Sequence, residues 1–152
     1  RPAVLTSIPF PCSMIVLTYY ESILDNLGCC HNFDVYGHLD YIARYIPANS
    51  YTYNWHDFND LICIILKTII EQGKGIEVNT AGLKYGMPEP NPCLDIVKMY
   101  HDLGGEIITV GSDAHEVKFF AYRFDVVADM LKNAGFNYYT IFNERKPEFI
   151  RL

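Results

Sequence analysis

The chain has 152 residues, of which half are hydrophobic and 14% aromatic, and its formal net charge at pH 7 is −6. This length fits one domain, and this apolar content excludes long disordered segments. Only 12 Lys and Arg residues are present and they form no dense cluster, which argues against a nucleic-acid-binding surface.

The first half of the chain predicts helices and strands in alternation. Residues 17–27 form an amphipathic helical pattern, and residues 33–37 read as a short strand. A polar, Tyr-rich loop is expected over 47–54. The strongest helix signal lies at 57–72, where apolar residues recur at three- and four-residue spacing, and residues 76–79 predict the next strand.

The second half continues the alternation. A loop rich in Gly and Pro at 80–91 leads to a helix predicted over 92–103, with a proline in its first turn. An apolar strand is expected at 106–110, a helix at 124–133 and a strand at 138–142. Strict alternation with short loops favours parallel strands joined by crossover helices. Four strands do not close a barrel, so the pattern fits either a small open sheet or part of a larger barrel.

The five cysteines indicate a reducing compartment, and we expect a cytoplasmic protein with buried free thiols. No Cys-x-x-Cys pair exists, which excludes a zinc ribbon or a thioredoxin-like motif. The apolar N-terminal run 4–17 is interrupted by Pro9 and Pro11, so it predicts neither a signal peptide nor a membrane span. Because the chain begins with Arg1, we expect that it is a piece of a longer protein.

Candidate metal ligands follow two of the predicted strands. His38 comes directly after the first strand, and Asp113 and His115 follow the strand at 106–110. The carboxyl ends of parallel strands share one edge of a sheet, so these three side chains could approach one metal cluster. Carboxylate and imidazole groups suit zinc, manganese or iron. The alternative is that Ser112-Asp113 is a turn or helix-cap signal and that His38 is structural.

Two cations are predicted near the same edge. Arg44 lies six residues beyond His38, and Lys84 lies in the loop after the strand at 76–79. Cations beside a metal suit a phosphate monoester, which Arg can grip with two hydrogen bonds. The alternative is that both are solvated surface charges. A structural placement is expected for Glu77 on its strand, and no nucleophile elbow, Walker loop or dinucleotide fingerprint is present.

Four segments together resemble the PHP-type histidinol phosphatases. They are Gly37–Tyr45, Glu77–Gly86, Gly104–His115 and Gly135–Phe149, and the resemblance covers about Tyr19 to Leu152. The resemblance implies the C-terminal part of a distorted (β/α)7 barrel with parallel strands, whose family holds three divalent metal ions (Zn, Mn or Fe). It further implies hydrolysis of L-histidinol phosphate to L-histidinol and phosphate in histidine biosynthesis.

The resemblance also assigns roles to individual residues. His38, Asp113 and His115 would be metal ligands, with Asp113 beside the nucleophilic water. Arg44 would clamp the substrate phosphate, and Lys84 would help it at a position where the family often has Arg. Lysine keeps the charge at that position but lacks the planar guanidinium fork.

One departure from the family bears on activity. The family's N-terminal half carries a His-x-His motif, and this chain has none. We therefore expect residues 1–152 to be a partial PHP domain that lacks the N-terminal half of the barrel, with residues 1–18 unplaced. Exposed barrel edges would favour self-association. The alternatives are an inactive fragment or scaffold, and a PHP phosphoesterase that acts on another phosphate ester.

Overall fold

The computed structural model describes residues 12–46 and 52–152, so most of the predicted loop 47–54 and the first eleven residues lie outside the described part. The elements in chain order are α1 (Cys12–Cys29), β1 (Val35–Tyr36), η1 (Tyr41–Tyr45), η2 (Trp55–Phe58), α2 (Asn59–Glu71), β2 (Gly75–Asn79), α3 (Ala81–Lys84), α4 (Leu94–Asp102), β3 (Ile108–Gly111), η3 (Val117–Phe119), α5 (Phe124–Ala134), β4 (Tyr138–Asn143) and β5 (Lys146–Arg151). Residues 12–18, which the sequence left unplaced, begin α1.

A three-stranded parallel sheet forms the centre of the molecule, in the order β1–β2–β3. Tyr36 pairs with Ile76, and Ile76 pairs with Ile108 on the other side. The predicted parallel arrangement of the first three strands is confirmed. Their carboxyl ends therefore meet at one edge of the sheet.

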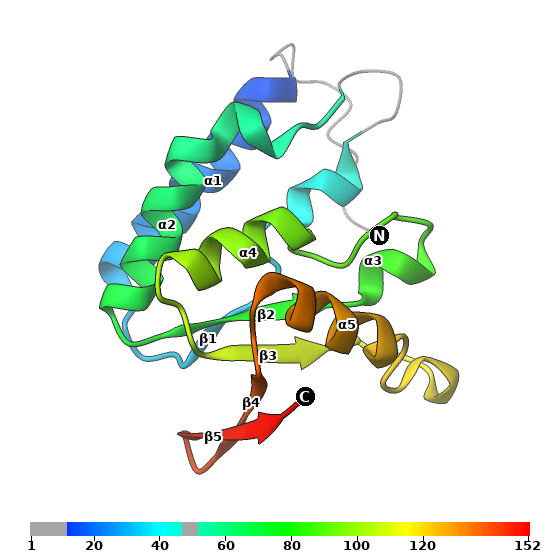
Figure 1. The fold of residues 1–152 in the computed structure, drawn as a ribbon. Coiled ribbons are helices and arrows are strands. Elements are labelled where there is room, and N and C mark those ends of the chain that lie inside the picture. Colours follow the sequence, from blue (N-terminus) through cyan, green and yellow to red (C-terminus); the bar gives the residue numbers. More distant parts are fainter. Residues whose placement is uncertain (1–11, 47–51) are drawn as a thin grey trace.

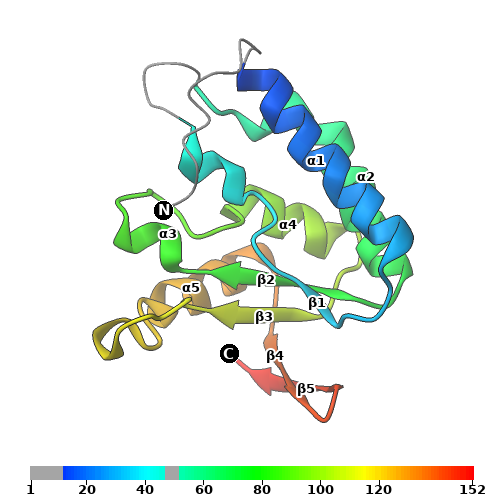
Figure 2. The same ribbon diagram turned by 180° about the vertical axis from the view of Figure 1, so that it is seen from behind.

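Helices cover one face of this sheet, where α1, α2 and α4 lie together (Figure 1, and from behind Figure 2). The 3.6-residue period explains the packing of α2, which buries Ile62, Ile65, Leu66 and Ile69 along one side. The helix predicted at 124–133 corresponds to α5, which ends at Gly135 with a left-handed φ of 103°. Among the described residues, no helix is both long and apolar enough to cross a membrane.

The prediction of a fourth parallel strand is wrong. β4 pairs antiparallel with β5, and this hairpin lies on the side of the sheet opposite the helices (Figure 1). Its two-residue turn places Glu144 and Arg145 at positive φ, a conformation usually signalled by Asn-Gly. Arg145 donates hydrogen bonds to Asp34 at 2.8 and 3.0 Å, which ties this turn to the loop before β1. The sequence has no glycine there, so the hairpin was not predicted.

The expectation of buried thiols is also wrong for two of the cysteines. Cys29 and Cys30 are exposed, and Cys63 and Cys93 are half-buried; all four carry free thiols. The exposed pair lies at the C-terminal end of α1, beyond Leu27, the last residue that this helix buries.

Candidate functional site

Three strand ends form the floor of the candidate site. His38 follows β1, Asn79 ends β2 and Asp113 follows β3. His38 and Asp113 adopt left-handed backbone conformations, with φ of 58° and 47°, which non-glycine residues rarely do. Hydrogen bonds hold both turns, because the Tyr19 hydroxyl donates to the His38 carbonyl at 2.7 Å and the Lys84 Nζ donates to the Asp113 carbonyl at 2.9 Å. Such strained positions often mark functional sites.

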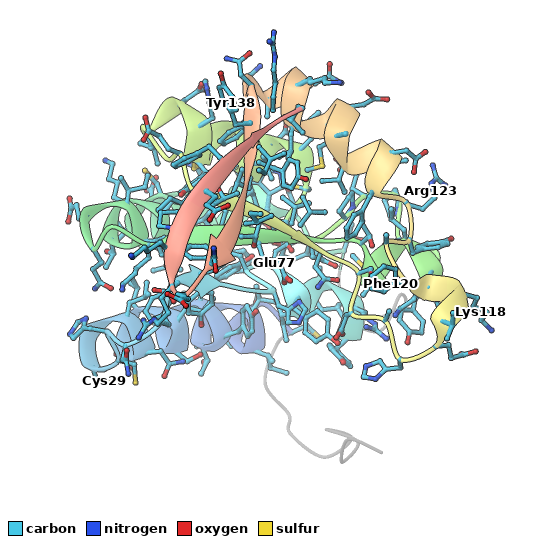
Figure 3. The ribbon with its side chains drawn as sticks, turned by 90° about the horizontal axis from the view of Figure 1, so that it is seen from below. Cys29, Glu77, Lys118, Phe120, Arg123 and Tyr138 are labelled. Carbon is cyan, nitrogen blue, oxygen red and sulfur yellow. The ribbon has the colours of Figure 1, made fainter. Side chains whose placement is uncertain are left out.

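Glu77 is the site residue that sequence reasoning missed. It lies on β2, with Gly37 and Gly111 of the neighbouring segments on either side. Its side chain lies on the face of the sheet that no helix covers (Figure 3). A Cβ added to Gly37 would lie 3.1 Å from Glu77 Oε2, and a Cβ added to Gly111 would overlap Oε1. The alternation Ile76-Glu77-Val78 places Glu77 on the face of β2 opposite to the two fully buried residues, but the sequence does not say which face the helices leave uncovered.

Two pairs of possible metal donors lie at this edge. His38 Nδ1 is 3.8 Å from Glu77 Oε2, is itself inaccessible to solvent and makes no hydrogen bond. His115 Nε2 is 3.9 Å from Asp113 Oδ1, and its side chain is 83% exposed. Within residues 12–46 and 52–152, no three or more His, Cys, Asp or Glu side chains converge on one metal position. The predicted set of His38, Asp113 and His115 is therefore present at one edge but not gathered into one group.

The two predicted cations lie beside these pairs among aromatic rings. The guanidinium carbon of Arg44 is 3.6 Å from the centre of the Tyr85 ring, and its Nη1 donates to the Tyr41 hydroxyl at 3.0 Å. Tyr41 in turn stacks on His38, with ring centres 4.7 Å apart. Lys84 lies 5.6 Å from the same Tyr85 ring. Tyr41 and Tyr85 thus link both cations to the strand ends.

A buried carboxylate forms hydrogen bonds between the loops that carry the candidate metal donors and cations. Asp40, only 2% exposed, accepts hydrogen bonds from Asn91 Nδ2 at 2.7 Å and from the Cys93 backbone N–H at 3.2 Å. The backbone of Asn91 pairs with that of Asn79 at the end of β2. Burial raises the pKa of Asp40 to about 6, and the two hydrogen bonds oppose that rise. Asp40 therefore connects the segment after β1 with the loop after β2.

Comparison with known proteins identifies the relatives of this chain. No family model matches it. It is 43% identical over 110 residues to a probable histidinol-phosphatase of Thermotoga maritima, covering 72% of this chain and 44% of that protein. It is 31% identical over 117 residues to a probable histidinol-phosphatase of Clostridium acetobutylicum, covering 77% of this chain and 46% of that protein.

The fold has a counterpart among solved structures. A crystal structure of histidinol phosphate phosphatase from Lactococcus lactis superposes with a TM-score of 0.69 at 24% identity, over 87% of this chain and 50% of that one. The α/β architecture is therefore shared with that protein. The chain spans about half the length of the proteins it matches. It is thus a relative of the histidinol phosphatases that corresponds to part of their length, as its motifs predicted.

Proposed function

We propose that this chain supplies one part of a metal-dependent phosphomonoesterase that hydrolyses L-histidinol phosphate to L-histidinol and phosphate. The observation that carries the proposal is that Arg44 and Lys84 share the carboxyl edge of the sheet with His38 and Asp113. The relatives named histidinol-phosphatase support the substrate, and the L. lactis structure was solved with zinc, L-histidinol and phosphate.

The donors at this edge fit part of a divalent-metal site. His38 Nδ1 lacks a hydrogen-bond partner beside the Glu77 carboxylate, which is the environment of an imidazole ready to bind a cation. Asp113 and His115 form the second pair. A trinuclear centre of Zn, Mn or Fe would need further donors from outside the described residues. A bound divalent metal would polarise the phosphoryl oxygens and lower the pKa of a bound water.

The chain's own residues would bind and orient the phosphate ester. The guanidinium carbon of Arg44 lies 3.6 Å from the Tyr85 ring centre and its Nη1 donates to Tyr41, and its other N–H groups would hydrogen bond two phosphate oxygens. Lys84 adds a second positive charge as a point donor, because it has no guanidinium fork. Asp113 would accept a hydrogen bond from the attacking water and orient it toward phosphorus.

We further propose that the sheet belongs to a distorted (β/α)7 barrel and that residues 1–152 contribute its C-terminal half. Helices cover only one face of the sheet, and Glu77 and its two flanking glycines lie on the other, as the inner face of a barrel would require. The coverage of about half of the L. lactis chain supports this assignment.

Phosphate release from L-histidinol phosphate, measured with added Mn²⁺ or Zn²⁺, tests the function. We expect turnover that falls by about 10³-fold or more in Asp113→Asn, because the proposed role of this residue is to orient the reacting water. Asp102→Asn is the matched control, because Asp102 is 67% exposed at the end of α4. Equal rates for the two variants would contradict the assigned role. If other phosphate monoesters were hydrolysed as fast as L-histidinol phosphate, the proposed substrate would be contradicted.

The second candidate function is a non-catalytic scaffold. It is favoured because no three metal donors converge in the described part of the chain. The same assay separates the two, because a scaffold would neither bind Mn²⁺ or Zn²⁺ nor release phosphate.

A further inference from the structure

We propose that Cys29 and Cys30 form a dithiol site that captures one trivalent, thiophilic arsenic centre, with an adjoining apolar pocket that receives an aromatic ring carried by that atom. The two Sγ atoms are 3.6 Å apart and both residues are exposed at the end of α1. Figure 3 shows Cys29 at the opposite side of the molecule from Lys118 and Phe120, whose loop follows the strand β3. The thiol pair therefore lies away from the loop after β3, while its pocket reaches Gly37, the residue before His38.

A disulfide between these neighbours is geometrically disfavoured. Consecutive Cα atoms across a trans peptide lie about 3.8 Å apart, whereas ordinary disulfides need about 4.4 Å or more. Cys29 also ends a helix, and its thiol approaches the Asn26 carbonyl at 3.7 Å, a contact that closing the S–S bond would disturb. We expect this pair to remain as two thiols.

A single bridging atom fits the pair better. Two bonds of about 2.3 Å, the length of a zinc–thiolate bond, span about 3.8 Å when they meet near the tetrahedral angle, close to the observed 3.6 Å. Zinc itself prefers four ligands, and no group of three or more donors exists among the described residues. A monosubstituted trivalent arsenical needs only two thiolates, because its third bond goes to carbon.

The chemistry is a balanced condensation without a redox change. An organoarsonous acid, R–As(OH)₂, forms two As–S bonds with Cys29 and Cys30. The two As–OH bonds break, and each hydroxide leaves as water with one thiol proton. The hydrogen bond with Cys30 raises the pKa of Cys29, but the reaction needs no preformed thiolate because both thiol protons leave in the water.

A pocket beside the pair selects the group on arsenic. Cys30 opens on a cavity of about 290 Å³, which Leu27, Phe33 and Tyr36 line with apolar and aromatic surface. Phe33 and Tyr36 meet edge to face, with ring centres 6.1 Å apart. A phenyl ring on the bound arsenic would lie against these side chains and remove apolar surface from water.

Mass spectrometry of the intact, reduced chain with phenylarsine oxide tests the dithiol site. We expect one adduct per chain, mapped to Cys29 and Cys30, that 2,3-dimercaptopropanol removes and excess monothiol does not. Cys29→Ala and Cys30→Ala should each weaken binding by at least about a hundredfold, because the second bond is then lost. Cys63→Ala and Cys93→Ala are the matched controls and should bind as the wild type does.

An adduct on Cys63 or Cys93, or one that monothiols displace from the wild-type chain, would overturn the proposal without relying on any variant. Methylarsine oxide tests the pocket: we expect it to bind about tenfold more weakly than the phenyl compound. Phe33→Ala should remove that difference. Equal affinities of the two compounds for the wild-type chain would refute the role of the pocket.

Discussion

The buried Asp40 carboxylate makes the stability of the fold depend on pH in an unusual direction. Its pKa of about 6 in the folded chain lies above the value of about 3.9 expected in the unfolded chain. Between these values the folded state binds the proton more tightly, so stability falls as pH rises. The two pKa values differ by about two units, which corresponds to about 3 kcal/mol in total, of which about 2 kcal/mol is lost between pH 4 and pH 7.

Urea unfolding of the wild type and of Asp40→Asn at pH 4, 5, 6 and 7 measures this contribution. The variant carries no ionisable group at this position, so the difference between the two proteins isolates Asp40 from the other carboxylates. We expect the free energy of unfolding of the wild type, relative to the variant, to fall by about 2 kcal/mol across this range. Parallel pH profiles would refute the reasoning, because they would mean that the folded state does not hold the proton of Asp40.

Three further predictions concern packing and assembly. Gly105→Ala should lower the free energy of unfolding by about 1–3 kcal/mol, because its Cβ would overlap the fully buried Tyr100 ring. Gly28→Ala should raise that free energy by about 0.5–1 kcal/mol, because no atom lies near its Cβ within α1. Urea unfolding measures both, and results of opposite sign would contradict the packing at these positions. Self-association through exposed strand edges predicts a sedimentation coefficient that rises with concentration; a constant monomer value would contradict it.

Much of the fold follows from periodicity in the sequence. The helix α5 and the pairing of β1, β2 and β3 match the predicted order, because strong apolar patterns and terminal glycines mark their ends. The β4–β5 hairpin could not be predicted, because its turn uses Glu144 and Arg145 in place of glycine. The contacts of Arg145 with Asn32 and Asp34, more than 100 residues earlier, hold that turn, and such a contact leaves no local signal.

The sequence indicates the edge of the sheet at which the candidate site lies, and the roles of its residues stay predictions. His38, Arg44, Lys84, Asp113 and His115 lie near the carboxyl edge that parallel pairing defines. The sequence predicts only a structural place for Glu77, because alternation on a strand does not say which face the helices leave uncovered. Asp40 was not singled out, since its partners Asn91 and Cys93 are more than 50 residues away.

The most direct test of the proposed function is the metal content per chain of protein purified without chelators, measured together with phosphate release from L-histidinol phosphate. We expect divalent metal bound to the chain together with turnover, and we expect Asp113→Ala to lose both. Protein that stays metal-free when Mn²⁺ or Zn²⁺ is added would contradict the proposed metal site, and would favour the scaffold as the function of this chain.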